Sequence, residues 1–203
     1  MLITVANLKG GVGKTTTSVM LALGFAKHGR TLLIDADPKQ SSALEWAGLA
    51  ENWPLNCSVV AISGKGLAQR ASSLIGDYEH VIIDCGAKSS LETRQALMVT
   101  DQLIVPASPR ALDIVEIPTT FTLAAEIDAV SPVDAVVLLT QVRAATRSSV
   151  DVRAVLLERD IPTLRSQVRL REAFAGAYGT VPDSLMDYDD VLAELIGGEK
   201  DGR

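Results

Sequence analysis

The sequence contains only two cysteines among its 203 residues, Cys57 and Cys85, and their spacing is not that of a metal-ligand motif. We therefore expect a reduced, cytoplasmic setting. No apolar run approaches the ~20 residues that span a bilayer, and the apolar start is interrupted too early for a signal peptide. The formal charge of −6 argues against a protein that is basic throughout, although it leaves room for a local basic patch.

Apolar segments alternate with segments of helical spacing along most of the chain. The strand candidates are unbroken and often β-branched, as is typical of strands buried on both faces. They are residues 2–6, 31–35, 58–62, 80–84, 102–106 and 135–140. The helix candidates are residues 16–28, 41–47, 67–75, 91–99, 114–130 and 150–159. Pro118 predicts that the fifth helix begins near it or is kinked there.

This alternation predicts the α/β class, with a doubly wound, mainly parallel sheet flanked by helices. We expect residues 1–203 to form a single domain, ending in an acidic helical segment at about residues 183–203. Ligands of such sheets bind beyond the carboxyl ends of the strands. Candidate functional residues are therefore sought where the predicted strands end.

A glycine-rich segment follows the first predicted strand. It consists of Lys9, Gly10, Gly11, Val12, Gly13, Lys14, Thr15 and Thr16. Where a strand turns through glycines into a helix, backbone N–H groups converge and the helix dipole adds positive potential, which favours phosphate. Lys14 would place an ammonium group at the β- and γ-phosphates, and the Thr15 hydroxyl would ligate Mg²⁺. The segment therefore predicts a nucleoside triphosphate site.

Two of the predicted strands end in carboxylates. Asp35 and Asp37 follow the second strand and lie on the same side of the chain, because strand side chains repeat every two residues. Asp84 ends the fourth strand, as in a Walker B motif whose acid holds Mg²⁺. Buried charges need a partner, which Mg²⁺ and an attacking water would supply. An alternative for Asp37 is that it caps the following helix.

The strict P-loop pattern requires a glycine where this chain has Leu8. The segment 9–16 instead resembles the deviant Walker A motif of the ParA/MinD family of ATPases. Residues 35–38 resemble the Walker A′ motif of that family and residues 81–84 its Walker B motif. Residues 85–88, Cys-Gly-Ala-Lys, depart from the commoner Asp-Thr/Cys-Pro-Pro, which leaves the coupling of nucleotide state to the dimer surface open.

The resemblance implies an ATPase with ATP and Mg²⁺ as cofactors. Lys9 would reach across a dimer interface to the nucleotide of the partner subunit, and the alternative is an ordinary solvated lysine. Asp37 would orient the hydrolytic water, and Asp35 and Asp84 would support the Mg²⁺ shell. The chain lacks the Asn-Lys-x-Asp motif that reads guanine, and its residues 140–143 follow the sixth strand, where the family contacts adenine.

The C-terminal part indicates a particular branch of the family. Residues 161–181 resemble the end of small ParA partition ATPases that lack an N-terminal helix-turn-helix domain. Between residues 143 and 171 there are seven arginines and three acids, which suits contact with DNA phosphate. A solvated surface with a few ion pairs would explain the same pattern. The arginines predicted to touch DNA are Arg143, Arg147, Arg165, Arg169 and Arg171.

The resemblance implies a partition ATPase that forms an ATP-dependent homodimer on non-specific nucleoid DNA and is released when a ParB-like or cargo-adaptor protein stimulates hydrolysis. Its cargo would be plasmid or chromosomal DNA, or alternatively a protein assembly such as a chemoreceptor array or carboxysome. A MinD-like membrane ATPase is disfavoured, because the acidic tail would be repelled by anionic lipid. A redox enzyme is disfavoured by its cysteine positions, while an amidoligase-type synthetase stays possible.

Overall fold

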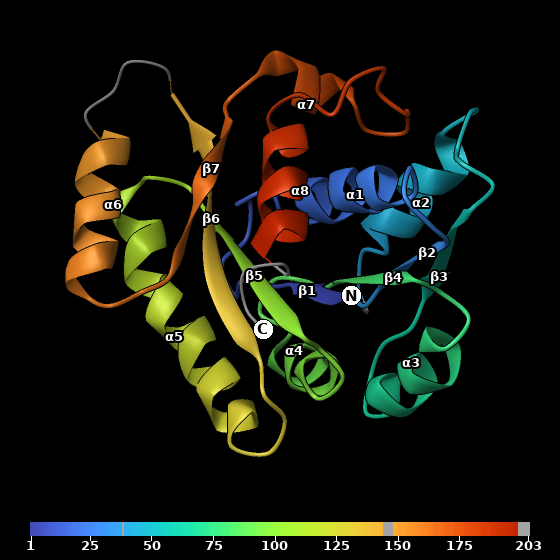
Figure 1. Ribbon diagram of the computed structural model, residues 1–203, viewed down its shortest axis with the longest axis horizontal. Helices are drawn as coiled ribbons and strands as arrows, with labels where there is room; N and C mark the ends of the chain where they lie inside the picture. The colour runs from blue at the N-terminus through green and yellow to red at the C-terminus, as the bar shows by residue number, and fades with distance from the viewer. Residues whose placement is uncertain (38, 144–147, 199–203) are drawn as a thin grey trace.

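The computed structural model describes residues 1–37, 39–143 and 148–198, and Pro38 and Arg147 of the predicted set lie outside these ranges. Seven strands form one sheet in the order β3-β2-β4-β1-β5-β6-β7 (Figure 1). The strands are β1 (Leu2–Val5), β2 (Thr31–Asp35), β3 (Cys57–Ala61), β4 (His80–Asp84), β5 (Gln102–Ala107), β6 (Asp134–Val142) and β7 (Thr163–Arg169). Every described pairing is parallel, which confirms the predicted fold class.

Helices cover both faces of this sheet (Figure 1). On one face lie α1 (Lys14–Phe25), α2 (Ser42–Leu49), α7 (Glu172–Gly176) and α8 (Asp187–Gly198). On the other face lie α3 (Leu67–Ile75), α4 (Ser90–Leu97), α5 (Ala111–Asp128) and α6 (Ser148–Glu158). Two apolar clusters, one on each side of the sheet, join the helices to the strands.

The unbroken apolar strands supply both clusters at once. In β2, Leu32 and Ile34 enter the cluster under α3, α4, α5 and α6, while Leu33 enters the cluster under α1, α2 and α8. Successive side chains of a strand point to opposite faces, so a strand covered on both faces carries a nearly continuous apolar run. This is why the inner strands could be recognised from the sequence.

The fifth helix contradicts one of the two predicted alternatives, a start near Pro118, while a kink at Pro118 stays a prediction. It begins at Ala111 rather than near Pro118, which lies inside it. The first turn forms because the carbonyl of Arg110 accepts hydrogen bonds from the N–H groups of Asp113 and Ile114. The prediction gave the proline too much weight: it bars one N–H donor within a helix but does not fix where the helix starts.

The strand β7 was absent from the prediction, because it is an edge strand with mixed polarity. Its buried residues are Leu164 and Val168, and its other side chains are polar or charged. Two carboxylates of α8 bind its backbone: Glu194 accepts the N–H groups of Arg165 and Ser166 at 2.7 and 2.8 Å, and Asp187 accepts that of Arg169 at 2.9 Å. These contacts satisfy donors that an edge strand would otherwise leave open to another strand.

The helix α8 lies within the segment predicted to be an acidic helix and packs against α1 and β7. The close approach of α1 and α8 depends on Gly24, where an added Cβ would lie 3.0 Å from Cδ2 of Leu192. Among the residues that the structure describes, no helix combines the length and the apolar character needed to cross a membrane.

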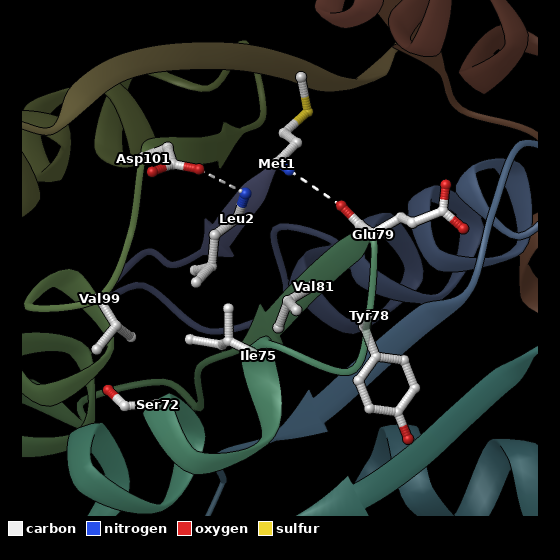
Figure 2. Close-up of a pocket in the computed structure, with 9 residues that line it drawn as sticks. All are labelled: Met1, Leu2, Ser72, Ile75, Tyr78, Glu79, Val81, Val99 and Asp101. Carbon is white, nitrogen blue, oxygen red and sulfur yellow. Dashed lines mark hydrogen bonds between the residues drawn. The ribbon is translucent and has the colours of Figure 1, made fainter.

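A cavity of about 420 Å³ lies at the amino ends of β1 and β4. Figure 2 shows its lining, in which the Met1 ammonium donates to the Glu79 carbonyl oxygen and the Leu2 N–H donates to Asp101. Its lining combines apolar side chains, among them Ile75 and Val81, with the charged Asp101 and the Met1 ammonium. It lies at the opposite edge of the sheet from the predicted phosphate segment.

Candidate nucleotide-binding site

The carboxyl ends of β1, β2 and β4 meet at one edge of the sheet. The register pairs Asp84 with Val5 of β1 and with Asp35 of β2, so the segments that follow these strands lie side by side. They enclose a cavity of about 390 Å³. The lining residues are Gly10, Gly11, Gly13, Lys14, Thr15, Thr16, Asp37, Lys39, Gln40, Ser42, Cys85, Gly86 and Ala87.

The glycine-rich segment forms a loop that leads directly into α1. Gly11 and Gly13 have φ values of 74° and 85°, a left-handed region that residues with a Cβ adopt only with strain, so glycine is favoured at both positions. The helix α1 begins at Lys14, and the carbonyl of Gly13 accepts the N–H of Thr17 at 2.8 Å. The loop therefore ends at a helix N-terminus, where an anion is favoured.

The Lys14 side chain is buried at the floor of this loop. Its ammonium donates to the carbonyl of Lys9 at 2.7 Å. Burial lowers the pKa of Lys14, whereas the nearby carboxylates of Asp84 and Asp37 act in the opposite direction. The ammonium group is thus held by one carbonyl of the loop, at the cavity that Lys14 lines.

The Asp84 carboxylate lies in contact with the first turns of α1. It accepts hydrogen bonds from the hydroxyls of Thr15 at 2.8 Å and Ser18 at 2.9 Å. Burial raises the pKa of Asp84 to about 7, although these two hydroxyls favour the charged form. Ser18 was missing from the prediction, although it lies three residues after Thr15 and so on the same helix face.

The donor set around Asp84 fits Mg²⁺. Within the described ranges, no group of three or more His, Cys, Asp and Glu side chains is placed to hold a metal ion. Mg²⁺ in nucleotide sites usually takes one or two protein ligands and completes its shell with phosphate and water, so a protein cage is not needed. Thr15 and Asp84 would hold the ion, which would neutralise phosphate charge.

Asp35 is engaged with the backbone of the next helix. Its Oδ2 accepts the N–H groups of Ala43 and Leu44 in the first turn of α2, and its Oδ1 accepts the N–H of Asp37. Burial raises the pKa of Asp35, and these three donors oppose that shift. Of the two aspartates, Asp35 therefore binds the helix N-terminus, and its part in the Mg²⁺ shell stays a prediction.

Asp37 lines the nucleotide cavity, and its carboxylate lies against Gly86. Its Oδ1 accepts the N–H of Lys39 at 2.8 Å, which fixes the side chain within its loop. A Cβ added at Gly86 would lie 2.5 Å from Cγ of Asp37. The segment after β4, which looked unusual in the sequence, thus leaves room for this carboxylate, a relationship that spacing alone did not reveal.

The Lys9 side chain points toward α5 of its own chain. Its ammonium lies 3.9 Å from a carboxylate oxygen of both Asp113 and Glu116. Asp113 is buried and also accepts a hydrogen bond from Ser108. Lys9 is therefore held at the rim of the site by two acids that the sequence analysis did not single out.

Three side chains, one just before the loop and two from β6, hold the loop in place. Asn7 donates to the carbonyl of Pro106 at 2.8 Å and accepts the N–H of Lys9. At the end of β6, Thr140 donates to the carbonyl of Val12 and Gln141 to that of Gly11. The sequence placed residues 140–143 near the nucleotide, but their hydrogen bonds to the loop required the structure.

The predicted DNA-contacting arginines have different surroundings. Arg165 and Arg169 are exposed on β7 and line a groove of about 420 Å³ that also contains Asp187 and Asp190. Arg171 donates twice to Asp187, at 3.1 and 2.7 Å, so its charge is already paired. Arg143 is exposed beyond the end of β6, and Arg147 lies outside the described residues.

Comparison with known proteins gives a consistent picture. An AAA domain family matches residues 1–61, the part that contains the glycine-rich loop and β2. The chain is 35% identical over 181 residues to maintenance of carboxysome distribution protein A of Gloeobacter kilaueensis, covering 85% of this chain and 78% of the relative. It is 26% identical over 183 residues to protein ParA of Rhizobium radiobacter, covering 87% and 82%.

Among solved structures, the septum site-determining protein MinD of Pyrococcus horikoshii, complexed with Mg-ADP, superposes with a TM-score of 0.79. The identity is 15%, and the match covers 99% of this chain and 97% of the other. That structure holds Mg-ADP, a nucleotide and metal of the predicted kind, and the cofactors predicted for this chain, ATP and Mg²⁺, fit the residues that line its cavity. The glycine-rich loop, the acids at its rim and the extent of the sequence match together show that this chain belongs to the ParA/MinD family of deviant Walker A ATPases.

Proposed function

We propose that this protein is a Mg²⁺-dependent positioning ATPase whose ATP-bound dimer holds to DNA until a partner protein stimulates hydrolysis. The observation that carries the proposal is the cavity itself, where Lys14, the Thr15–Asp84 pair and Asp37 converge. The loop N–H groups and Lys14 would bind the phosphates, and Asp37 would orient the attacking water. Mg²⁺ would neutralise charge on the β- and γ-phosphates.

The dimer part of the proposal rests on Lys9 and its surroundings. Lys9 lies at the rim, and the first turns of α5 beside it expose Leu112 and Val115. Exposed apolar side chains beside the charged Lys9 are typical of a surface that a second copy of the chain covers. Lys9 would exchange its ion pairs with Asp113 and Glu116 for the phosphates of the partner.

Fewer arginines are proposed to contact DNA than the sequence suggested. Arg171 is paired with Asp187, so the arginines best placed for phosphate are Arg165 and Arg169. Asp187 and Asp190 share their groove and weaken its positive potential in one subunit. Dimerisation would double the number of arginines, and linked weak sites can gain ~10²–10⁴ in affinity when geometry permits.

The cargo has two candidates. Plasmid or chromosomal DNA, held by a ParB-like protein, is favoured by the likeness to protein ParA. A protein assembly, held by a cargo adaptor, is favoured by the higher identity to a carboxysome distribution protein, 35% against 26%. We place the protein cargo first for that reason.

The proposal is tested with Asp37→Ala, which keeps the phosphate and Mg²⁺ residues but removes the carboxylate that orients water. With ATP, this variant should stay dimeric in light scattering and bind unrelated duplexes in fluorescence anisotropy. Its affinity should fall steeply with salt and should be lost with ADP. A stable ATP-bound dimer that does not bind DNA even at low salt would contradict the proposed DNA binding.

A matched variant identifies the DNA surface. Adding Arg165→Ala and Arg169→Ala to Asp37→Ala should weaken DNA binding and flatten its salt dependence while the dimer persists. Replacing the exposed Arg159, which follows α6 and does not line the groove, by Ala provides a control for the loss of a surface arginine and should change little. Unchanged DNA affinity after the double replacement would show that another surface contacts DNA.

A further inference from the structure

Gln141 has a backbone conformation that its residue type disfavours. It lies within β6 with φ = 53°, in the left-handed region where side chains cause steric strain. The pairing of β6 with β7 is irregular at this point, with a register shift between Leu139 and Val142. A glycine would suit this backbone better, so the Gln141 side chain has to compensate for the strain.

That side chain reaches the phosphate-binding loop. Its Nε2 donates to the carbonyl of Gly11 at 2.7 Å, and the neighbouring Thr140 hydroxyl donates to the carbonyl of Val12 at 2.8 Å. Two consecutive peptide groups of the loop are thus held by two consecutive residues of β6. Thr140 is buried, so its hydroxyl is confined to this contact.

Holding these carbonyls also fixes the direction of the N–H groups. A trans peptide is planar and its C=O and N–H point in opposite directions, so the carbonyl of Gly11 sets the N–H of Val12, and that of Val12 sets the N–H of Gly13. In the sheet, β6 lies on one side of β1, while β4 and β2 lie on the other. The residues after β4 and β2, including Asp37 and Gly86, line the nucleotide cavity.

We propose that Gln141 is a positioning residue, which together with Thr140 draws two loop carbonyls toward β6 and so turns the N–H groups of Val12 and Gly13 toward the nucleotide phosphates. This proposal rests on the nucleotide site proposed above. The strain at Gln141 is accepted because a donor of this length is needed at this position. Loss of the donor should weaken phosphate binding without weakening the fold.

Three variants separate the donor from the backbone. Gln141→Gly removes both the strain and the donor, and Gln141→Glu keeps the shape but places a carboxylate against the Gly11 carbonyl. Gln141→Asn tolerates the left-handed backbone, but its side chain is one methylene too short. Asp160→Gly is the matched control, because Asp160 also has φ = 53° but lies in the exposed turn after α6.

The measurements are the affinity for a slowly hydrolysed ATP analogue with Mg²⁺, by calorimetry, and the melting temperature without nucleotide. Gln141→Gly and Gln141→Asn should bind the analogue about five- to tenfold more weakly, the loss expected for one oriented hydrogen bond. Gln141→Glu should bind it more weakly still. Gln141→Gly should nevertheless melt at the same or a higher temperature, and Asp160→Gly should rise similarly with unchanged affinity.

A purely structural role for Gln141 predicts the reverse pattern, with a lower melting temperature and unchanged affinity in the folded protein. That result, or unchanged affinity in Gln141→Glu, would overturn the proposal. Lys14→Ala distinguishes this failure from failure of the site. If Lys14→Ala also binds the analogue normally, the nucleotide site is wrong, and if only the Gln141 variants bind normally, the positioning role is wrong.

Discussion

Replacing Gly86 by alanine should displace the carboxylate of Asp37 and little else. A Cβ at Gly86 would lie 2.5 Å from Cγ and 2.9 Å from Oδ1 of Asp37, whereas non-bonded carbon atoms prefer about 3.5–4.0 Å. The carboxylate must therefore retreat by roughly 1 Å. Because this carboxylate is at the end of a short side chain and Asp37 lies in a loop, it can move without disturbing the sheet.

The proposed role of Asp37 makes this displacement costly for hydrolysis. A misplacement of about 1 Å can cost roughly 10²-fold in rate, which corresponds to about 2.7 kcal/mol in the barrier. The kcat for ATP should fall by about that factor, measured by phosphate release under saturating ATP. Affinity for ATP should change by less than the roughly fivefold that one hydrogen bond of about 1 kcal/mol is worth, because the Lys14 and Thr15 contacts are untouched.

A control glycine shows whether the effect is local. Gly48 lies in α2, and a Cβ there would meet nothing within 4 Å. Gly48→Ala should stabilise the helix by about 1 kcal/mol and leave kcat unchanged. If Gly86→Ala hydrolyses ATP at the normal rate, the position of the Asp37 carboxylate does not govern hydrolysis.

Three other perturbations follow from the same contacts. Lys14→Ala removes a charge-assisted contact worth about 1.5–3 kcal/mol, so ATP affinity measured by calorimetry should drop at least tenfold. Burial raises the pKa of Asp84 to about 7, so a proton competes with Mg²⁺ below that pH, and half-maximal ATPase activity should need more Mg²⁺ at pH 6 than at pH 8. The hydrogen bond from Arg171 lowers the pKa of Asp187, and two backbone donors lower that of Glu194 although burial opposes them. Both carboxylates therefore stabilise the fold above about pH 4 and lose that contribution as the pH falls below it. Thermal melting between pH 3 and pH 6 should show the loss, and Asp187→Asn should flatten the curve.

The parts of the fold that the sequence predicted are those that a single physical rule determines. The inner strands are covered on both faces, so β2 and β4 are apolar at their three central positions and were predicted with their observed bounds, Thr31–Asp35 and His80–Asp84. The edge strand β7 has only Leu164 and Val168 buried, and nothing in its pattern marks a strand. Its identity depends on the pairing with β6 and on carboxylates that come from α8.

In the site, too, some features could be predicted from the sequence and others could not. The loop glycines, Lys14 and Asp84 could be named because phosphate and Mg²⁺ demand those residue types at those places. Contacts between distant segments could not be inferred, since spacing along the chain says nothing about which side chain faces which backbone group. The contact of Asp37 with Gly86 and the hydrogen bond of Gln141 to the loop are of this kind.

The central claim is that two copies of the chain cooperate in ATP hydrolysis. The most direct test is to mix two inactive variants and measure the ATPase activity of the mixture. Lys9→Ala keeps an intact phosphate loop but lacks the lysine for its partner, and Lys14→Ala keeps Lys9 but cannot bind ATP firmly. Each alone should show little ATPase activity, and an equimolar mixture should regain activity through hybrid dimers that contain one complete site. Full activity of Lys9→Ala alone, or no recovery in the mixture, would contradict a lysine that acts across the dimer.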